Sequence, residues 1–311
     1  MRVESACPPE VLARIADLDL VARIIVEGLV SGLHRSPFHG YSAEFSQYRH
    51  YRSGDDLKHV DWKLAARTDR VYTKQFRETT NMASAIVLDT SGSMDFPGVG
   101  SRLHNAKSGL EKTQTTPDPQ ITKFRYAVIA AAALAHLISS QGDAISLLAG
   151  ERFMAPRAGR QHLRGLLAGL VSLTPGGGWS AAGNIRRAAE RLKRRGLLFV
   201  LSDFYDDEER TLGELRRAAR MGHEVVLFQI LSRDEIDLPY RRDLEFTDLE
   251  SGRLLATNAG LARREYQDAI AAFLERWRSR AGAEGFQYSL IVTDTPPERA
   301  LRNFLLARVT R

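Results

Sequence analysis

The run Ala83–Leu88 is short, apolar and rich in small and β-branched residues, and it ends abruptly in an acid. A run of this kind, bounded by turn residues, predicts a strand that is buried on both faces, as in a parallel sheet. The turn that follows carries three side chains with oxygen atoms, and Gly92 relaxes the backbone between them. These side chains are Asp89, Ser91 and Ser93. Because open α/β sheets bind ligands beyond the carboxyl ends of their strands, this turn is the first candidate binding site.

Oxygen ligands suit a hard divalent cation, with Mg²⁺ as the first choice and Mn²⁺ or Ca²⁺ next. The alternative is structural: the strand ends in a turn of serine and glycine, and Asp89 caps the helix that follows. A pattern this short does not decide between the two interpretations.

Beyond this turn, apolar runs of strand length alternate with segments of helical periodicity. Helices are expected at 123–139, 161–173, 181–194, 208–221, 261–280 and 297–308. Strands are expected at 144–148, 152–155, 197–201, 224–230 and 286–292, with a hairpin at 244–256. Strands that alternate with helices predict a doubly wound, mainly parallel α/β sheet. We expect this domain to span residues 81–311.

Residues 1–80 are expected to form an N-terminal appendage, helical and irregular, that packs on the main domain. Apolar positions at helical spacing predict one amphipathic helix between about Pro9 and Leu33. The segment 44–62 mixes aromatic residues with charges of both signs, and the candidates for a buried aromatic layer are Phe45, Tyr48, Tyr51 and Trp62. We expect a structural network of ion pairs here rather than a catalytic site, because structural networks also gather such groups. The predicted network comprises Glu44, Arg49, Arg52, Asp55, Asp56, Asp61 and Trp62.

Composition narrows the class of protein. Hydrophobic residues make up 43% and charged residues 26% of the chain, which is typical of a globular protein. The net charge of +6 is dispersed without a basic patch interleaved with aromatic residues, so nucleic acid is not an expected partner. Cys7 is the only cysteine, which excludes a disulfide framework and fits a reducing cytoplasm. The apolar segment Leu20–Val30 is too short and too charged to predict a transmembrane span.

A second strand of the predicted sheet, 197–201, also ends in an acid, Asp203. Ser180 lies between the two acids in sequence, in a loop that opens a helix. In a doubly wound sheet these loops converge at one carboxyl edge, near the point where the strand order reverses. Residues 95–121 contain few apolar anchors, and we expect them to form an exposed loop beside the same edge.

Two resemblances connect these residues to known families. The string 89–93, Asp-Thr-Ser-Gly-Ser, resembles the Asp-x-Ser-x-Ser signature of von Willebrand factor A domains. Their metal-ion-dependent adhesion site also uses a loop threonine, for which Ser180 is the candidate here, and a later aspartate, whose position Asp203 resembles. The segment from Glu44 to Arg67 resembles the hallmark of the bacterial domain of unknown function 58 family, whose members carry a von Willebrand A-like domain.

The resemblance implies a non-enzymatic module that binds an acidic group of a protein partner through a divalent ion. The implied ligands are Asp89, Ser91, Ser93, Ser180 and Asp203. Members of the family commonly accompany MoxR-type AAA+ ATPases, so the implied role is the assembly or activation of a protein complex with such an ATPase.

The alternative is a metal-dependent hydrolase that uses the same carboxylates, together with the acidic run 206–209. Acids at the start of a helix are also expected from capping alone. Hydrolysis needs a general base within reach of a bound water. The three loops contain no histidine, although His104 in the segment 95–121 leaves this alternative open.

Overall fold

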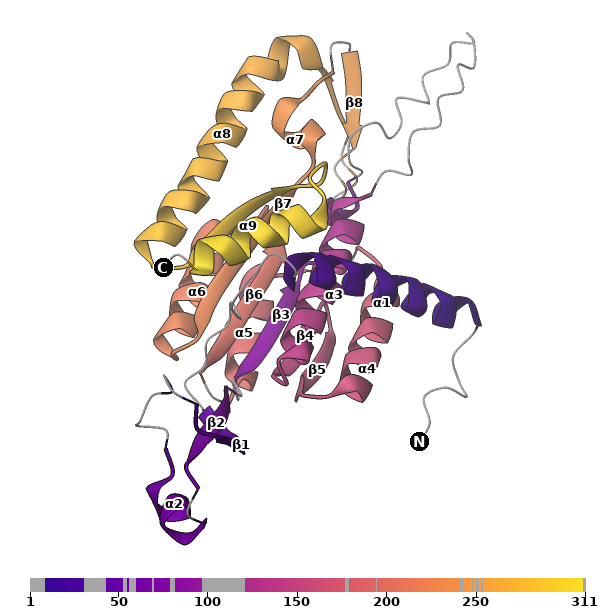
Figure 1. Cartoon of the computed structure of the whole chain (residues 1–311). Helices are drawn as coiled ribbons and strands as arrows, with labels where there is room; N and C mark the ends of the chain where they lie inside the picture. Colours follow the sequence, from indigo (N-terminus) through magenta and orange to yellow (C-terminus); the bar gives the residue numbers. More distant parts are fainter. Residues whose placement is uncertain are drawn as a thin grey trace.

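The computed structural model describes residues 9–30, 43–52, 55, 60–68, 70–78, 82–96, 121–176, 179–193, 195–240, 243–247, 249, 252 and 254–309. Its central feature is a six-stranded sheet with helices on both faces (Figure 1). The strands are β3 (Ala83–Leu88), β4 (Ala144–Ala149), β5 (Arg152–Arg157), β6 (Gly196–Ser202), β7 (Glu224–Leu231) and β10 (Gln287–Val292).

The strand order is β10-β7-β6-β3-β4-β5, and only the β4–β5 pair is antiparallel. Numbered along the chain within this sheet, the order is the doubly wound 3-2-1-4-5-6 arrangement, read from the β5 edge. The predicted fold class is therefore confirmed. The order reverses between β3 and β6, so the switch point, where such sheets bind ligands, lies between these two strands.

The register brings the ends of β3 and β6 level with each other. Leu88, the last residue of β3, pairs with Leu201, and the next backbone N–H, that of Asp89, donates to the Leu201 carbonyl over 2.9 Å. Because the two strands are parallel and in step, the residues that follow each of them emerge side by side.

The two faces of β3 belong to two separate hydrophobic clusters. Ile86 and Leu88 face α1 (Pro9–Val30), α3 (Lys123–Ser140), α4 (Arg160–Val171) and α9 (Pro297–Val309). Ala85 and Val87 face α5 (Ala181–Arg191), α6 (Glu208–Arg220) and α8 (Ala259–Ala283). A strand covered on both sides has no polar face, which explains the continuous apolar run in its sequence.

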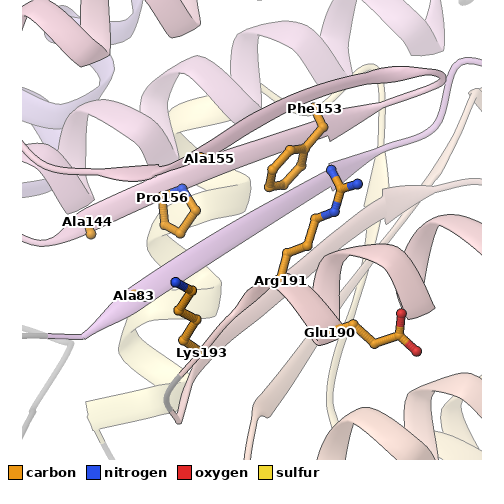
Figure 2. A pocket seen from close by; sticks show the side chains of 8 residues that line it. All are labelled: Ala83, Ala144, Phe153, Ala155, Pro156, Glu190, Arg191 and Lys193. Carbon is orange, nitrogen blue, oxygen red and sulfur yellow. The ribbon is translucent and has the colours of Figure 1, made fainter.

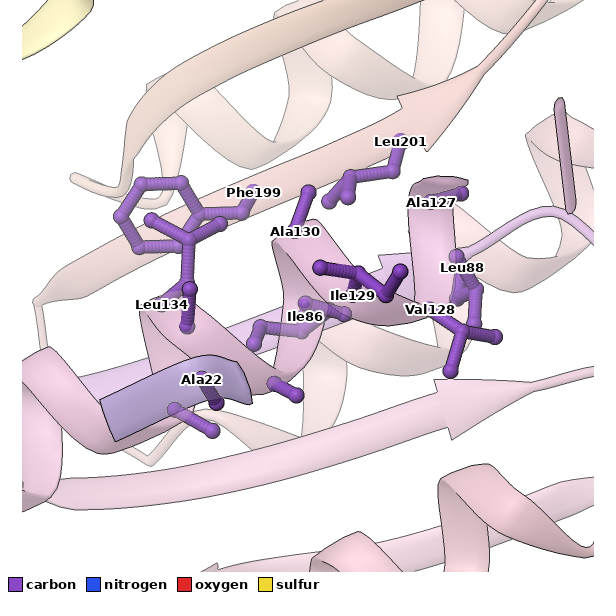
Figure 3. Close-up of a cluster of buried hydrophobic side chains, with 14 of the residues drawn as sticks. Ala22, Ile86, Leu88, Ala127, Val128, Ile129, Ala130, Leu134, Phe199 and Leu201 are labelled. Atoms are coloured by element: carbon purple, nitrogen blue, oxygen red, sulfur yellow. The ribbon is translucent and has the colours of Figure 1, made fainter. Parts of the chain in front are cut away.

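Helix α3 packs closely on the sheet because its inner face is built from small residues. Figure 3 shows Ala127, Ala130 and Leu134 of this helix beside Ile86 of β3, with Ala22 of α1 on the same cluster. Thr122 caps the helix by accepting a hydrogen bond from the Arg125 N–H over 3.1 Å. The first residue of the helix, Lys123, is completely buried, which is rare for a charged side chain.

The N-terminal segment contains two elements that the sequence pattern did not indicate, β1 (Ala43–His50) and α2 (Trp62–Thr68). β1 pairs in antiparallel fashion with β2 (Tyr72–Glu78), a strand that the alternating residues 71–76 do predict. The segment 44–62 was expected to be irregular, and the first part of it is a strand. Mixed charges and aromatic residues obscure the two-residue alternation that would have indicated this strand.

The described part of the predicted ionic network is built around Asp55. Its carboxylate accepts from the Arg52 backbone N–H over 2.9 Å and from Arg49 over 2.7 Å, and these contacts hold its pKa below the ordinary value. Asp61 accepts from the Tyr48 hydroxyl over 3.0 Å. Trp62 and Tyr48 are 62% and 43% exposed, so they do not form the buried aromatic layer that was expected. The Glu44 side chain and Asp56 lie outside the described residues.

The remaining elements are α7 (Arg233–Asp237), a one-turn helix missed by the sequence pattern, and the hairpin β8 (Asp243–Thr247) and β9 (Leu254–Asn258). A hairpin was expected at this place. Most of the expected exposed loop, residues 97–120, lies outside the described residues. Within the described residues, every helix falls short of the length or the apolar character that crossing a bilayer requires.

Candidate functional site

Asp89 is held at the end of β3 by hydrogen bonds to both of its carboxylate oxygens. The Ser91 backbone N–H donates to Oδ1 over 2.8 Å, and the Ser202 hydroxyl donates to Oδ2. Asp89 is only 1% exposed. The side chain therefore has a fixed orientation inside the edge of the sheet, with β3 supplying the carboxylate and β6 supplying a hydroxyl.

The two serines of the turn connect β3 to the second acid. Ser91 Oγ and Ser93 Oγ lie 3.0 Å apart, and the Ser93 hydroxyl donates to Asp203 Oδ2 over 2.7 Å. The other oxygen of Asp203 accepts from the Tyr205 N–H over 3.2 Å. The structure thus brings together four of the five residues predicted as metal ligands, Asp89, Ser91, Ser93 and Asp203.

The electrostatics of this cluster favour a positive charge close to Asp89. Burial, and then the nearby charge of Asp203, raise the pKa of Asp89 to about 7. Both causes penalise the ionised carboxylate, because it has lost its water and faces a second negative group. A cation beside Asp89 would relieve both effects and would return the carboxylate to its ionised form.

Lys123 is the feature of the site that the sequence pattern did not reveal. Its ammonium group lies 2.7 Å from Asp203 Oδ2 and 2.6 Å from Glu235 Oε1, and the Tyr205 ring lies over it, with its centroid 5.0 Å away. Burial lowers the pKa of Lys123, but the two carboxylates more than offset this, so its pKa lies above the ordinary value. The lysine is therefore charged at neutral pH.

One sequence signal does exist for this lysine. A cation in the first turn of a helix opposes the positive end of the helix dipole, so it needs a compensating partner. Lys123 is the first residue of an alanine-rich helix, and its partners come from the loop after β6 and from α7. Glu235 is well placed for this contact because its other oxygen, Oε2, accepts from the Ser232 N–H over 2.7 Å in the capping box of α7.

Ser180 has a local role in the described structure. Its hydroxyl accepts from the Gly183 N–H over 3.2 Å and so caps α5, and the Ala181 N–H donates to Asp206 Oδ2 over 2.7 Å. Among the described residues, Ser180 forms its hydrogen bonds with Gly183 and Asn184 of α5 rather than with Ser91 or Ser93. The loop does approach the site, because the Gly176 N–H donates to the Thr90 carbonyl over 2.8 Å.

The donor set fits a hard divalent cation. Two hydroxyl oxygens and two carboxylates converge, and one of the carboxylates has a raised pKa that a cation would reverse. In the part of the chain that the structure describes, no group of three or more histidine, cysteine, aspartate or glutamate side chains is arranged to hold a metal. An ion at this edge would therefore depend on Ser91 and Ser93.

The described residues line two pockets in different parts of the molecule. A pocket of about 320 Å³ opens beside the site and is lined by Tyr205, Glu235, Tyr266, Ala269, Ile270 and Phe273. A larger pocket of about 610 Å³ includes Ala83 and Ala144, the first residues of β3 and β4 (Figure 2). There, the Arg191 guanidinium lies over the Phe153 ring, 4.1 Å from its centroid. This second pocket starts at the amino ends of the strands, so it is not part of the site around Asp89.

A doubly wound sheet that carries an Asp-x-Ser-x-Ser turn at its switch point defines a von Willebrand factor A-like domain. More specifically, residues 47–275 match the family described as "Protein of unknown function DUF58". The chain belongs to this family, as the hallmark in its N-terminal segment indicated.

Relatives and solved structures were also found. Uncharacterized proteins of Mycobacterium tuberculosis and Mycobacterium bovis are 27% identical over 257 residues, which cover 78% of this chain and 72% of theirs. BatB from Bacteroides thetaiotaomicron is 14% identical with a TM-score of 0.44, over 74% of this chain and 100% of that chain. The SpRpn10 VWA domain is 14% identical with a TM-score of 0.37, over 72% of this chain and 93% of that chain. These structural likenesses are too distant to transfer a function.

Proposed function

We propose that this protein is a non-enzymatic interaction module that binds an acidic group of a protein partner through a divalent ion. The ion is Mg²⁺, or alternatively Mn²⁺ or Ca²⁺, at the carboxyl edge of β3 and β6. Ser91 and Ser93 supply neutral hydroxyl ligands, and Asp89 and Asp203 supply the negative charge around them. Ser180 is the candidate for an additional hydroxyl ligand from the α5 loop.

The observation that carries the proposal is the chain of contacts from Asp89 through Ser91 and Ser93 to Asp203. Ser93 Oγ lies between Ser91 Oγ and Asp203, so two hydroxyl oxygens and a carboxylate adjoin one another, and such oxygen ligands suit a hard divalent cation. Neutral hydroxyl ligands donate less electron density to the ion than carboxylates would. Because Mg²⁺ is seldom enclosed completely by protein ligands, a carboxylate from a partner suits the remaining position.

The proposed partner system includes a MoxR-type AAA+ ATPase, and the proposed role is the assembly or activation of a protein complex. Support for this part comes from the family to which the chain belongs, since its members commonly accompany such ATPases. We propose that the protein works in the cytoplasm, where its single cysteine would stay reduced.

The test compares Asp89→Ala with the wild-type protein in binding to the MoxR-type ATPase of the same organism, with Mg²⁺ present throughout. Both proteins are kept in Mg²⁺ because chelation would also disable the ATPase. We expect at least a tenfold loss of affinity, since the variant lacks one of the two carboxylates that compensate the ion. Pull-down followed by titration calorimetry measures the change.

Asp17→Ala is the matched control, because Asp17 is an exposed acid on α1, away from the sheet edge. This control is expected to bind like the wild-type protein. If Asp89→Ala stays folded and binds the ATPase with unchanged affinity, the ion-bridged mechanism is wrong.

The hydrolase alternative has one observation in its favour, the pKa of Asp89 near 7, which is the range that suits a general base. Asp89 is nevertheless buried, and both of its oxygens already accept hydrogen bonds from Ser91 and Ser202. A general base must reach the proton that it removes, so this geometry favours the binding function.

A further inference from the structure

The charges around Lys123 are not balanced. Three carboxyl groups, those of Asp89, Asp203 and Glu235, lie at this edge of the sheet, and within the described residues the cation Lys123 contacts two of them, Asp203 and Glu235. One ammonium can compensate only one of the three groups when all are ionised. A further cation would therefore be attracted to this edge, although the ammonium group of Lys123 already occupies part of it.

Resting on the proposed function, we propose that Lys123 is an internal counter-ion that lowers the affinity of the site for divalent ions. Its ammonium contacts Asp203 Oδ2, the same oxygen that accepts from the Ser93 hydroxyl. A divalent ion bound through Ser93 would share Asp203 with this ammonium. The two cations would repel each other across a buried carboxylate, where water screens charges weakly.

Lys123 cannot leave the site easily when an ion arrives. The whole side chain is buried, and the Tyr205 ring lies over the ammonium group. Moving the ammonium away from Asp203 and Glu235 would leave charges unpaired in the interior, which is costly. The repulsion therefore persists after the ion has bound, and it weakens binding.

The arrangement also makes the ion and the partner depend on each other. A carboxylate supplied by a partner adds negative charge at the ion, which offsets the repulsion from Lys123. Each ligand then increases the affinity for the other, because coupling between two binding events is reciprocal. The lysine would thus keep the site weakly occupied until an acidic partner completes it.

The test is a titration with Mg²⁺ alone, by calorimetry, of the full chain in four forms: wild type, Lys123→Met, Glu235→Gln, and the double variant. Methionine keeps the length of the side chain and removes the charge, so Lys123→Met should bind Mg²⁺ at least tenfold more tightly. Glu235→Gln removes a negative charge and leaves the lysine, so it should bind Mg²⁺ several-fold more weakly. The double variant removes one charge of each sign and should stay within about threefold of wild type, because nearby charges contribute with opposite signs.

The inference is overturned if folded Lys123→Met binds Mg²⁺ no more tightly than wild type, or if Glu235→Gln binds it no more weakly. Thermal melts establish that each variant is folded. If Lys123→Met does not fold, Glu235→Gln and the double variant decide the question by their direction of change.

Failure of the proposed ion-bridged function would give a different result in the same titrations. If none of the four proteins binds Mg²⁺ or Mn²⁺ at millimolar concentration, the ion-bridged function fails together with the inference. Binding by the wild-type protein that all three variants match overturns the role of Lys123 alone. Binding by Lys123→Met without binding by the wild-type protein supports the inference in its strongest form.

Discussion

Ser202 is the residue on which the geometry of the acidic edge depends most directly. Its hydroxyl donates to Asp89 and accepts from the Phe204 N–H over 2.9 Å, and the side chain is buried. Phe204 has a left-handed backbone with φ of 60°, which a residue other than glycine rarely adopts. The phenylalanine ring packs against Trp277 with centroids 4.6 Å apart, so one serine holds both the acid and the turn after β6.

We expect Ser202→Ala to lower the free energy of unfolding by about 1–3 kcal/mol, because Asp89 and the Phe204 N–H each lose a buried hydrogen-bond partner. Urea denaturation measures this change. Ser146→Ala is the control: Ser146 is equally buried but has one long hydrogen bond of 3.3 Å, to the Ser84 carbonyl. Equal losses in the two variants would show that the double role of Ser202 does not matter.

At the scale of single residues, the sequence predicted the site residues that directly follow a strand. It missed the site residues that come from helices distant in the sequence. Asp89 and Asp203 each come directly after a buried apolar run, so strand ends alone place them at one edge. Lys123 and Glu235 are separated by 112 positions, and they meet only because α3 and α7 pack at the same end of the sheet. No local pattern records such a contact.

At the scale of single elements, the start of β6 shows how closely the two central strands approach. Gly196 pairs with Ala83, and a Cβ atom at position 196 would lie 2.0 Å from the Ala83 carbonyl oxygen. A backbone atom in a paired strand cannot move aside as a flexible side chain can. Only glycine therefore fits at the first position of β6.

Gly196→Ala is expected to lower the free energy of unfolding by about 1–3 kcal/mol or more, since the added methyl group forces the strands apart. Gly213→Ala is the contrasting control, because Gly213 is an exposed position of α6 with open space around it. There, alanine should stabilise the helix by about 0.5–1 kcal/mol. Chemical denaturation of both variants tests whether the two changes in the free energy of unfolding have opposite signs. An unchanged stability of Gly196→Ala would contradict the close approach of the two strands.

Elements with a clear apolar pattern were predicted to within about three residues at each end, and several elements without one were missed. β6 and β7 are buried along most of their length, so their sequences contain almost no polar interruptions. β1 lies in a segment of mixed charge and aromatic residues, and α7 has only five residues, too few for a helical period to become visible. The two groups of elements differ in whether burial imposes a periodic pattern of apolar residues on their sequences.

At the scale of the whole molecule, α1 belongs to the same core as the sheet although more than fifty residues separate it from β3. Leu18 and Leu29 are buried in the cluster that contains α3 and α9. The Arg302 guanidinium of α9 donates to the Gly28 carbonyl over 2.6 Å. Apolar packing and this polar contact together join the first described helix to the last.

We therefore expect Leu29→Ala to lower the free energy of unfolding by about 2–5 kcal/mol while the protein still unfolds in one transition. Ile24→Ala on the same helix should change stability by less than about 0.5 kcal/mol, because Ile24 is 58% exposed. Urea denaturation followed by circular dichroism distinguishes these outcomes. A separate early transition in Leu29→Ala would mean that α1 is an independent unit.

The backbone of Lys123 has a consequence of its own. Its N–H donates to the Phe96 carbonyl over 3.2 Å, so the chain departs from the acidic edge and returns to it at nearly the same point. Doubling the length of an excursion with fixed ends adds only about 0.6 kcal/mol of closure entropy. Because Phe96 and Lys123 are joined directly to each other, a change in the number of residues between them is expected to leave the acidic edge in place.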